Sequence, residues 1–221
     1  MTASAEAPKR TERSAASDAS AAGAAQRRRP LVRHPFRRKN FQPRTLVLYL
    51  AGVAAIAAAR PTPSLFLAGL ALVLAGQALR LWATGYLLKT DELTVAGPYA
   101  HLRHPLYAGA LLMGSGFALM AGPAVAAVVL PIGLAFYFGY YLRYKERVES
   151  ERLESLYGDA FRAYRTNVPA LLARLRPWRS AAAAPPRWRV DRVLENNEQT
   201  ALVYTLVACL SIAALGMLRA A

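Results

Sequence analysis

The sequence is poor in cysteine and in acidic residues, and each shortage narrows the classes of protein that it could encode. Cys209 is the single cysteine among 221 residues, so an internal disulfide framework and a thiolate metal site are both excluded. Because Cys209 lies in an apolar stretch, we expect an inert buried thiol. Asp and Glu number 13 against 28 Lys and Arg, which gives a formal net charge of +15 at pH 7. Such an excess of positive charge favours an anionic partner, either a nucleic acid or a membrane surface.

Motifs for binding nucleotides and metals are absent too. No Gly-x-Gly-x-x-Gly pattern joins a strand to a helix, and there is neither a P-loop nor a spacing of metal ligands. These absences exclude a Rossmann domain and a phosphate-binding loop, and we expect no metal. The chain also lacks an apolar stretch near its start, so we expect no cleavable secretory signal.

Apolar residues make up 55% of the chain and gather in runs, with the charges between them. Runs approaching the ~20 residues of a spanning helix cover residues 45–59, 64–78, 106–120, 124–141 and 201–218. A proline turn at 60–63 separates the first two runs, and Gly122-Pro123 separates the next two. The pattern predicts an all-α integral membrane protein with about five transmembrane helices, arranged as two helical hairpins plus a C-terminal span.

The basic residues give this arrangement a direction. They concentrate in residues 1–44, 80–104 and 143–198, whereas the two hairpin turns carry a single cation. By the positive-inside rule, these three segments are cytosolic, and the fifth run leaves the C-terminus outside. The absence of interleaved aromatics in the basic N-terminal segment favours a membrane surface over nucleic acid.

The same patterns divide the chain into four parts. We expect a disordered basic cytosolic tail over 1–43, a membrane core over 44–180, a linker over 181–198 and a C-terminal transmembrane helix over 199–221. Within the core, leucines and aromatics at helical spacing predict a cytosolic amphipathic helix over 144–164, interrupted near Gly158. The abundance of arginine and alanine suggests a bacterial protein, and hence the inner membrane.

Residues 97–109 join two of the apolar runs and carry an unusual set of side chains. Pro98 disfavours helix before it, and Pro105 suits the first turn of a new helix. Free backbone N–H groups at that helix start would face the same side as Arg103 and His104, which predicts a site for an anionic group. The alternatives are an interfacial arginine and a histidine that only caps the helix.

Small residues in the third run allow two interpretations. Gly109, Gly114 and Gly116 lie on it, and Ala110 lies four residues before Gly114. Such spacing permits close packing of helices in lipid. Alternatively, the glycines allow a ligand to approach the backbone.

A wider pattern of residues, taken in order, resembles the isoprenylcysteine carboxyl methyltransferase family, which is related to the membrane phospholipid methyltransferases. The resemblance covers about residues 76–177. It is carried by residues 79–83, Gly97-Pro98-Tyr99, Arg103-His104-Pro105-Leu106-Tyr107, Gly109, Glu149, Leu153, Tyr157-Gly158, Tyr164 and Val168-Pro169.

The resemblance implies an enzyme that binds S-adenosylmethionine on the cytosolic side and methylates a lipid-linked or isoprenoid acceptor from the bilayer. It implies catalytic roles for Arg103 and Glu149. The residues expected to bind the cofactor are Tyr99, His104, Pro105, Tyr107, Gly109, Tyr144 and Glu149.

One position departs from the family. Its helix motif has a second glutamate where this chain has Ser150, and Glu151 lies about 100° further around a helix. Glu149 could also pair with Lys145 or Arg152 on its own helix.

The chemistry of the acceptor stays open at this stage. A carboxylate is already nucleophilic and would need only an arginine such as Arg103 to orient it, and we favour this O-methylation. An amine would need a base, for which His104 and Glu149 are candidates. Two other classes remain as alternatives: a membrane reductase that uses a nicotinamide, and a non-catalytic membrane anchor with a basic tail.

Overall fold

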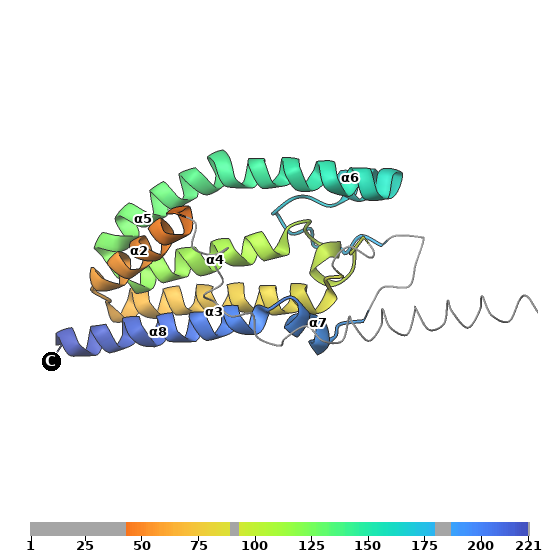
Figure 1. The fold of residues 1–221 in the computed structure, drawn as a ribbon. Coiled ribbons are helices and arrows are strands. Elements are labelled where there is room, and N and C mark those ends of the chain that lie inside the picture. Colours follow the sequence, from red (N-terminus) through yellow and green to blue (C-terminus); the bar gives the residue numbers. More distant parts are fainter. Residues whose placement is uncertain (1–42, 89–92, 180–186, 221) are drawn as a thin grey trace, which may run out of the picture. The chain divides into compact units, whose positions relative to one another are not determined.

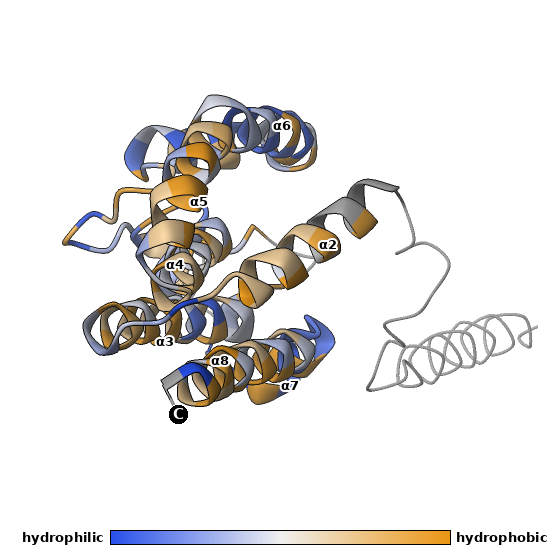
Figure 2. Ribbon diagram, turned by 90° about the vertical axis from the view of Figure 1, so that its left-hand side faces the viewer, coloured by the Kyte–Doolittle hydropathy of each residue, from blue (hydrophilic) through white to orange (hydrophobic). Residues whose placement is uncertain are grey.

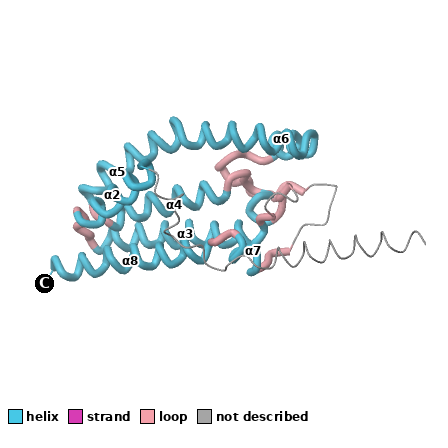
Figure 3. The backbone as a smooth tube through the Cα atoms, viewed as in Figure 1, coloured by secondary structure: helices cyan, strands magenta, loops and turns pink. Residues whose placement is uncertain are grey.

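The structure is a computed structural model that describes residues 43–88, 93–179 and 187–220. The predicted basic tail therefore lies outside the described residues, apart from its last residue. The described helices are α2 (Pro43–Ala57), α3 (Pro63–Tyr86), α4 (Pro105–Met120), α5 (Pro123–Phe136), α6 (Leu142–Asn167), α7 (Val190–Glu195) and α8 (Glu198–Ala220). A 3₁₀ helix, η2 (Gly97–Ala100), precedes α4, and a π-helical turn, η3 (Tyr137–Tyr141), joins α5 to α6. These ranges contain no strand, which confirms the all-α prediction (Figures 1 and 3).

Three helical stretches are long and apolar enough to cross a membrane, which supports an integral membrane protein. They are Pro63–Tyr86, the combined stretch Pro123–Asn167, and Glu198–Arg219. The apolar helix α4 is shorter, with 16 residues, and α2 has 15. The number of five spans therefore stays a prediction.

Helices α3 and α4 pack closely because glycines face each other at two levels. A Cβ atom on Gly69 would lie 2.4 Å from the carbonyl oxygen of Gly116, and one on Gly76 would lie 2.6 Å from that of Gly109. The spacing is seven residues on both helices, so the same face meets twice. Gly114 has nothing within 4 Å of such a Cβ. Small residues do allow the close packing, but through Gly109 and Gly116.

The two hairpin turns meet at one end of the helices. The N–H of Arg60 donates to the carbonyl of Ala121 at 2.8 Å. Gly122 has a φ of 101° and lies so close to the Arg60 carbonyl that a side chain would collide with it. Arg219, near the end of α8, donates to the carbonyl of Ala57 at 2.7 Å. This arrangement fits the predicted hairpins, with the end of α8 beside both turns.

The predicted amphipathic helix is not a separate element. It continues the preceding apolar helix through η3, so that Pro123–Asn167 forms a single stretch of 45 residues. Figure 2 shows the change along it, from mostly hydrophobic α5 to strongly hydrophilic α6. The extra residue of a π turn redirects the side chains without ending the helix. The interruption at Gly158 is confirmed, with φ of 51° and ψ of −122°.

Residues 187–198, which the composition assigned to a linker, instead cap the end of α3. The N–H of Arg189 donates to the carbonyl of Gly85 at 3.0 Å, and Nδ2 of Asn196 donates to that of Thr84 at 3.1 Å. A helix end leaves its last carbonyls without partners, so these contacts, together with the short helix α7, complete the end of α3. No local pattern indicates these contacts, because the capping partners lie about 100 residues apart in sequence.

Candidate active site

The turn before α4 is held by the chain that follows α6. The N–H of Arg103 donates to the carbonyl of Pro169 at 2.8 Å, and that of His104 donates to Ala170 at 3.0 Å. A second segment thus uses the N–H groups of Arg103 and His104. The N–H groups predicted to be free are those at the start of α4 itself, and of these Tyr107 donates to the carbonyl of His104 at 3.1 Å. The turn is fixed in position by the backbone of residues 168–178.

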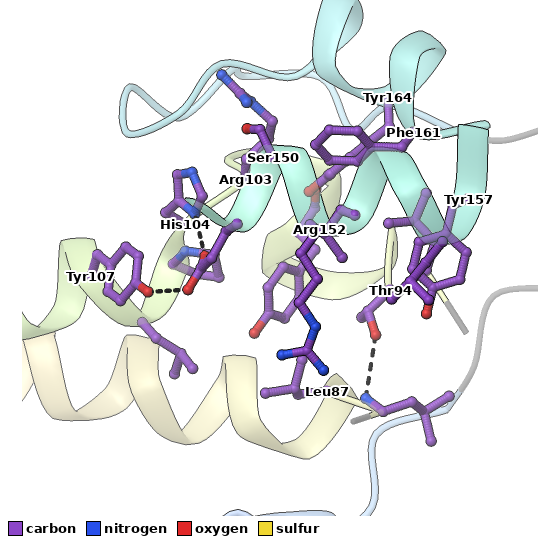
Figure 4. Close-up of a pocket in the computed structure, with 18 residues that line it drawn as sticks. Leu87, Thr94, Arg103, His104, Tyr107, Ser150, Arg152, Tyr157, Phe161 and Tyr164 are labelled. Atoms are coloured by element: carbon purple, nitrogen blue, oxygen red, sulfur yellow. Dashed lines mark hydrogen bonds and ion pairs between the residues drawn. The ribbon is translucent and has the colours of Figure 1, made fainter. Parts of the chain in front are cut away.

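A cavity of about 420 Å³ opens between this turn, α6 and the end of α3 (Figure 4). This volume is within the range of sites for small molecules. From the turn and α4, it is lined by Tyr99, Arg103, His104, Pro105, Leu106 and Tyr107. From α6, it is lined by Glu149, Ser150, Arg152, Leu153, Leu156, Tyr157, Phe161 and Tyr164. Leu87, Leu88, Leu93 and Thr94 close the remaining side.

Glu149 is at the centre of a small polar cluster in the cavity. Its carboxylate accepts a hydrogen bond from the hydroxyl of Tyr107, and its Oε2 lies 3.5 Å from Nδ1 of His104. In the described part of the chain, it makes no ion pair with Lys145 or Arg152. The structure therefore brings Glu149 to the Arg-His-Pro-x-Tyr motif and not to the cations of its own helix.

His104 is buried and precedes the first residue of α4. Its side chain makes no capping hydrogen bond, which removes the capping alternative. Burial lowers the pKa of His104 below its ordinary value of 6.5, the charge of Glu149 opposes this shift, and the charge of Arg103 adds to it. The imidazole is therefore neutral near pH 7. Its buried Nε2 has no hydrogen-bond partner among the described residues.

Arg103 is engaged with the protein. Its Nε donates to the carbonyl of Val168 at 2.9 Å, and its Nη2 forms an ion pair with Glu146 at 2.6 Å. Sequence reasoning missed Glu146, although it lies one helical turn before Glu149 and so on the same face of α6. Arg103 thus ties α6 and the following segment to the turn, and only its buried Nη1 lacks a partner within the described ranges.

Two predicted residues are not in the cavity. Gly109 packs against α3, where a Cβ would lie 2.6 Å from Cγ of Arg80. Tyr144 is exposed and stacks on Tyr140, with ring planes 4° apart. It lies five residues before Glu149, which places it about 140° away around the helix. Tyr99, Pro105 and Tyr107 do line the cavity, as predicted.

The departure at Ser150 has a clear structural counterpart. Ser150 is buried and lines the cavity, whereas Glu151 is exposed, so Glu151 does not replace the missing glutamate. The cation that does face the cavity is Arg152, and Figure 4 shows its guanidinium in the middle of the lining side chains. This guanidinium forms no ion pair or hydrogen bond with any described residue, whereas the backbone carbonyl of Arg152 accepts a hydrogen bond from Oγ of Ser155 at 2.8 Å. Periodicity alone could not distinguish Arg152 from a solvated arginine.

Comparison with known proteins matches the part of the chain that carries most of this cavity. Residues 64–160, from α3 to the kinked part of α6, match the phospholipid methyltransferase family. The chain is 29% identical over 107 residues to "Protein-S-isoprenylcysteine O-methyltransferase" of Schizosaccharomyces pombe, which covers 48% of this chain and 43% of that protein. The chain thus spans less than half the length of this relative. No solved structure matches the chain. The resemblance read from the motifs is confirmed.

Proposed function

We propose that this chain, whose residues 64–160 match the phospholipid methyltransferase family, is an S-adenosylmethionine-dependent methyltransferase. Its acceptor is a lipid-linked or isoprenoid group at the cytosolic face of the membrane, and O-methylation of a carboxylate is favoured. The name of the yeast relative, an isoprenylcysteine O-methyltransferase, supports the carboxylate chemistry.

The observation that carries the proposal is the uncompensated charge of Glu149. Its nearest ion-pair partner is His104, which is neutral near pH 7, so no described cation pairs with this carboxylate beside the cavity. A partly buried carboxylate without a cation favours a positively charged ligand. The methyl donor carries such charge on its sulfonium and its amino group, and when bound it would supply a methyl carbon that an acceptor can attack directly, with the sulfur as the leaving group.

The remaining lining residues fit the other parts of the donor. With Nδ1 of His104 facing the carboxylate of Glu149, the unpartnered Nε2 of the neutral ring is a hydrogen-bond acceptor for the amino group of the donor. Leucines and the rings of Tyr99 and Tyr157 offer an apolar surface for a base. Tyr107 orients the carboxylate of Glu149 through its hydroxyl. Arg103, predicted to orient an acceptor, is better described as the residue that positions α6.

A carboxylate acceptor suits this set of side chains. Its oxygen carries no proton, so the transfer from a bound donor would need no base, and the residues of the cavity would only have to hold and orient this oxygen. The site then needs a cation to hold the acceptor, and Arg152 is available in the cavity. An amine acceptor would instead have to lose a proton, for which neutral His104 is the candidate.

The test uses the full chain in nanodiscs with a radiolabelled methyl donor. Three acceptors are compared: an S-prenylcysteine with a free carboxylate, phosphatidylethanolamine, and total membrane lipid analysed by mass spectrometry. We expect base-labile label in the first acceptor and saturable binding of the donor. Label found only in the amine lipid would overturn O-methylation, and saturable binding of a reduced nicotinamide in place of the donor would favour a reductase.

Orientation is tested separately. Between Asp159 and Asp191, the sequence has seven arginines and no acidic residue, and it lies beside the cavity-bearing end of α6. The positive-inside rule therefore favours a cavity that faces the cytosol. A reporter fused after Pro123, at the opposite end of α4, is expected outside, and a cytosolic signal would contradict this orientation.

A further inference from the structure

The segment after α6, residues 168–179, exposes two leucines almost completely. Leu172 is 83% exposed and Leu175 is 97% exposed, the highest values among the large hydrophobic side chains of the described residues. The same segment also has an inner side, since Val168 is buried against Phe161 and Tyr164. The two leucines are therefore presented outward by a segment that is otherwise anchored.

The segment is also strongly basic. Arg176 and Arg179 are exposed beside the leucines, and no acidic residue occurs between Asp159 and Asp191. A surface with exposed leucines and arginines, and without acids, matches the headgroup region of an anionic bilayer, where apolar groups and phosphates lie side by side.

The backbone contacts of residues 168–179 place this segment at the level of the lipid headgroups. In addition to its bonds to Arg103 and His104, the segment donates from N–H of Arg174 to the carbonyl of His101 at 3.0 Å. The N–H of Trp178 donates to the carbonyl of Ala100 at 2.9 Å. These partners directly precede the apolar helix α4, and Figure 1 shows the segment turning back from α6 towards the start of α4. The ends of apolar helices lie at the membrane boundary, so the bonded segment lies there too.

We propose that residues 170–179 form a lipid-binding surface, with Leu172 and Leu175 in the interface of the membrane that the chain spans and Arg176 and Arg179 on anionic headgroups. This surface is distinct from the cavity, and it needs no methyl transfer to exist. Three backbone bonds join residues 170–179 to residues 100–104, and a fourth joins the adjacent Pro169 to Arg103, so lipid binding is connected to the turn that carries Arg103 and His104.

A spin label tests the placement of the leucines. Cys209 is the only cysteine, so Cys209→Ser gives a background in which Leu175→Cys carries the label, with Ser155→Cys on the exposed face of α6 as the control. The full chain is reconstituted in phosphatidylcholine, with and without phosphatidylglycerol. At 175 we expect collisions with oxygen to exceed those with a water-soluble nickel chelate, and the reverse at 155. Equal access of the chelate to both positions would overturn the proposal.

The arginines are tested in the same samples. Each cation near an anionic surface contributes a factor of about five in binding, so the added phosphatidylglycerol should deepen the label at 175. We expect Arg176→Gln with Arg179→Gln to abolish this lipid dependence, and the control pair Arg143→Gln with Arg147→Gln to retain it. An unchanged dependence would refute the role of the arginines. Spin–spin broadening between labels at 175 would assign the surface to a second copy of the chain, and so would also refute lipid binding. None of these results depends on methyl transfer.

Discussion

Two carboxylates on different helices, Glu149 and Glu198, have opposite surroundings. Glu198 is 3% exposed and receives two hydrogen bonds from Arg80, at 2.7 and 2.8 Å, and one from Gln77 at 3.2 Å. Glu149 is 40% exposed, and its polar neighbours are the hydroxyl of Tyr107 and the neutral imidazole of His104. A fully compensated charge has no capacity left for a ligand, whereas Glu149 has both space and unbalanced charge.

The cluster around Glu198, whose charge is compensated by Arg80, holds helices together. Gln77 also accepts a hydrogen bond from Thr205 at 3.2 Å, and Arg80 reaches the carbonyl of Leu106 at 3.5 Å, in the first turn of α4. Glu198 thus connects α8 with α3 and α4. Helix α8 lies outside residues 64–160, the part of the chain that matches the family.

The largest expected effect is on stability and comes from Glu198. We expect Glu198→Ala to lower the free energy of unfolding by about 3–5 kcal/mol, because it leaves Arg80 without its carboxylate. Glu149→Ala should lower it by about 1 kcal/mol or less, since part of that side chain meets solvent. Denaturant unfolding in micelles measures both, with the exposed Glu195→Ala as the control. Equal losses at Glu198 and Glu149 would remove the distinction between the clusters.

The next effect is on activity and comes from Glu149. Glu149→Gln keeps the shape but removes the charge, so we expect methyl transfer to fall by about 10²–10³-fold, as for loss of an electrostatic group at a reacting centre. The fold should persist, as checked by circular dichroism. Glu151→Gln, two residues away and exposed, should retain full activity. A loss of the same size in both variants would place the effect in the helix and not in the cavity.

A smaller effect concerns pH. Burial lowers the pKa of His104 below 6.5, so the unfolded chain takes up a proton before the native protein does. The contribution of His104 to stability is therefore complete above pH 6.5 and decreases as the pH falls through the lowered native pKa. We expect this part of the acid-side decline to disappear in His104→Gln and to persist in His101→Gln. An unchanged decline in His104→Gln would show that the imidazole titrates normally.

The smallest effects come from single hydroxyls, one in each cluster. Tyr107→Phe removes the bond to Glu149, and we expect transfer to fall about 2- to 10-fold with little change in stability. Thr205→Val removes the bond to Gln77, and we expect a loss of about 0.5–1.5 kcal/mol in stability with little change in transfer. Methyl-transfer kinetics and denaturant unfolding are measured for both variants. A loss of stability in Tyr107→Phe or a loss of transfer in Thr205→Val would contradict the separate roles of the two clusters.

The sequence predicted those features that depend on neighbours along the chain. Helices follow from apolar runs, the turns from Gly122 and the prolines, and the kink from Gly158. The residues of the Arg-His-Pro-x-Tyr motif and Glu149 were identified by their order, and the structure brings them to one cavity.

The features that escaped prediction depend on partners distant in sequence. Arg103 binds Glu146, and Glu198 binds Arg80 across 118 residues, pairings that no local pattern indicates. The N–H groups of Arg103 and His104 donate to Pro169 and Ala170, which are also distant in sequence. Tyr144 was misplaced because the rotation of α6 relative to the cavity is decided by packing.

The helix is continuous from α5 to α6, so a tilt of α5 in the membrane would also move α6. Glu149 lies eight residues beyond η3, or about 12 Å along the helix at 1.5 Å per residue. If α5 tilts by about 10° in a thinner or thicker bilayer, that length of helix moves the carboxylate by about 2 Å, enough to break or make a hydrogen bond. Membrane thickness would then change the separation of Glu149 from Tyr107. The bilayer would thereby alter the arrangement of polar side chains that binds a ligand in the cavity.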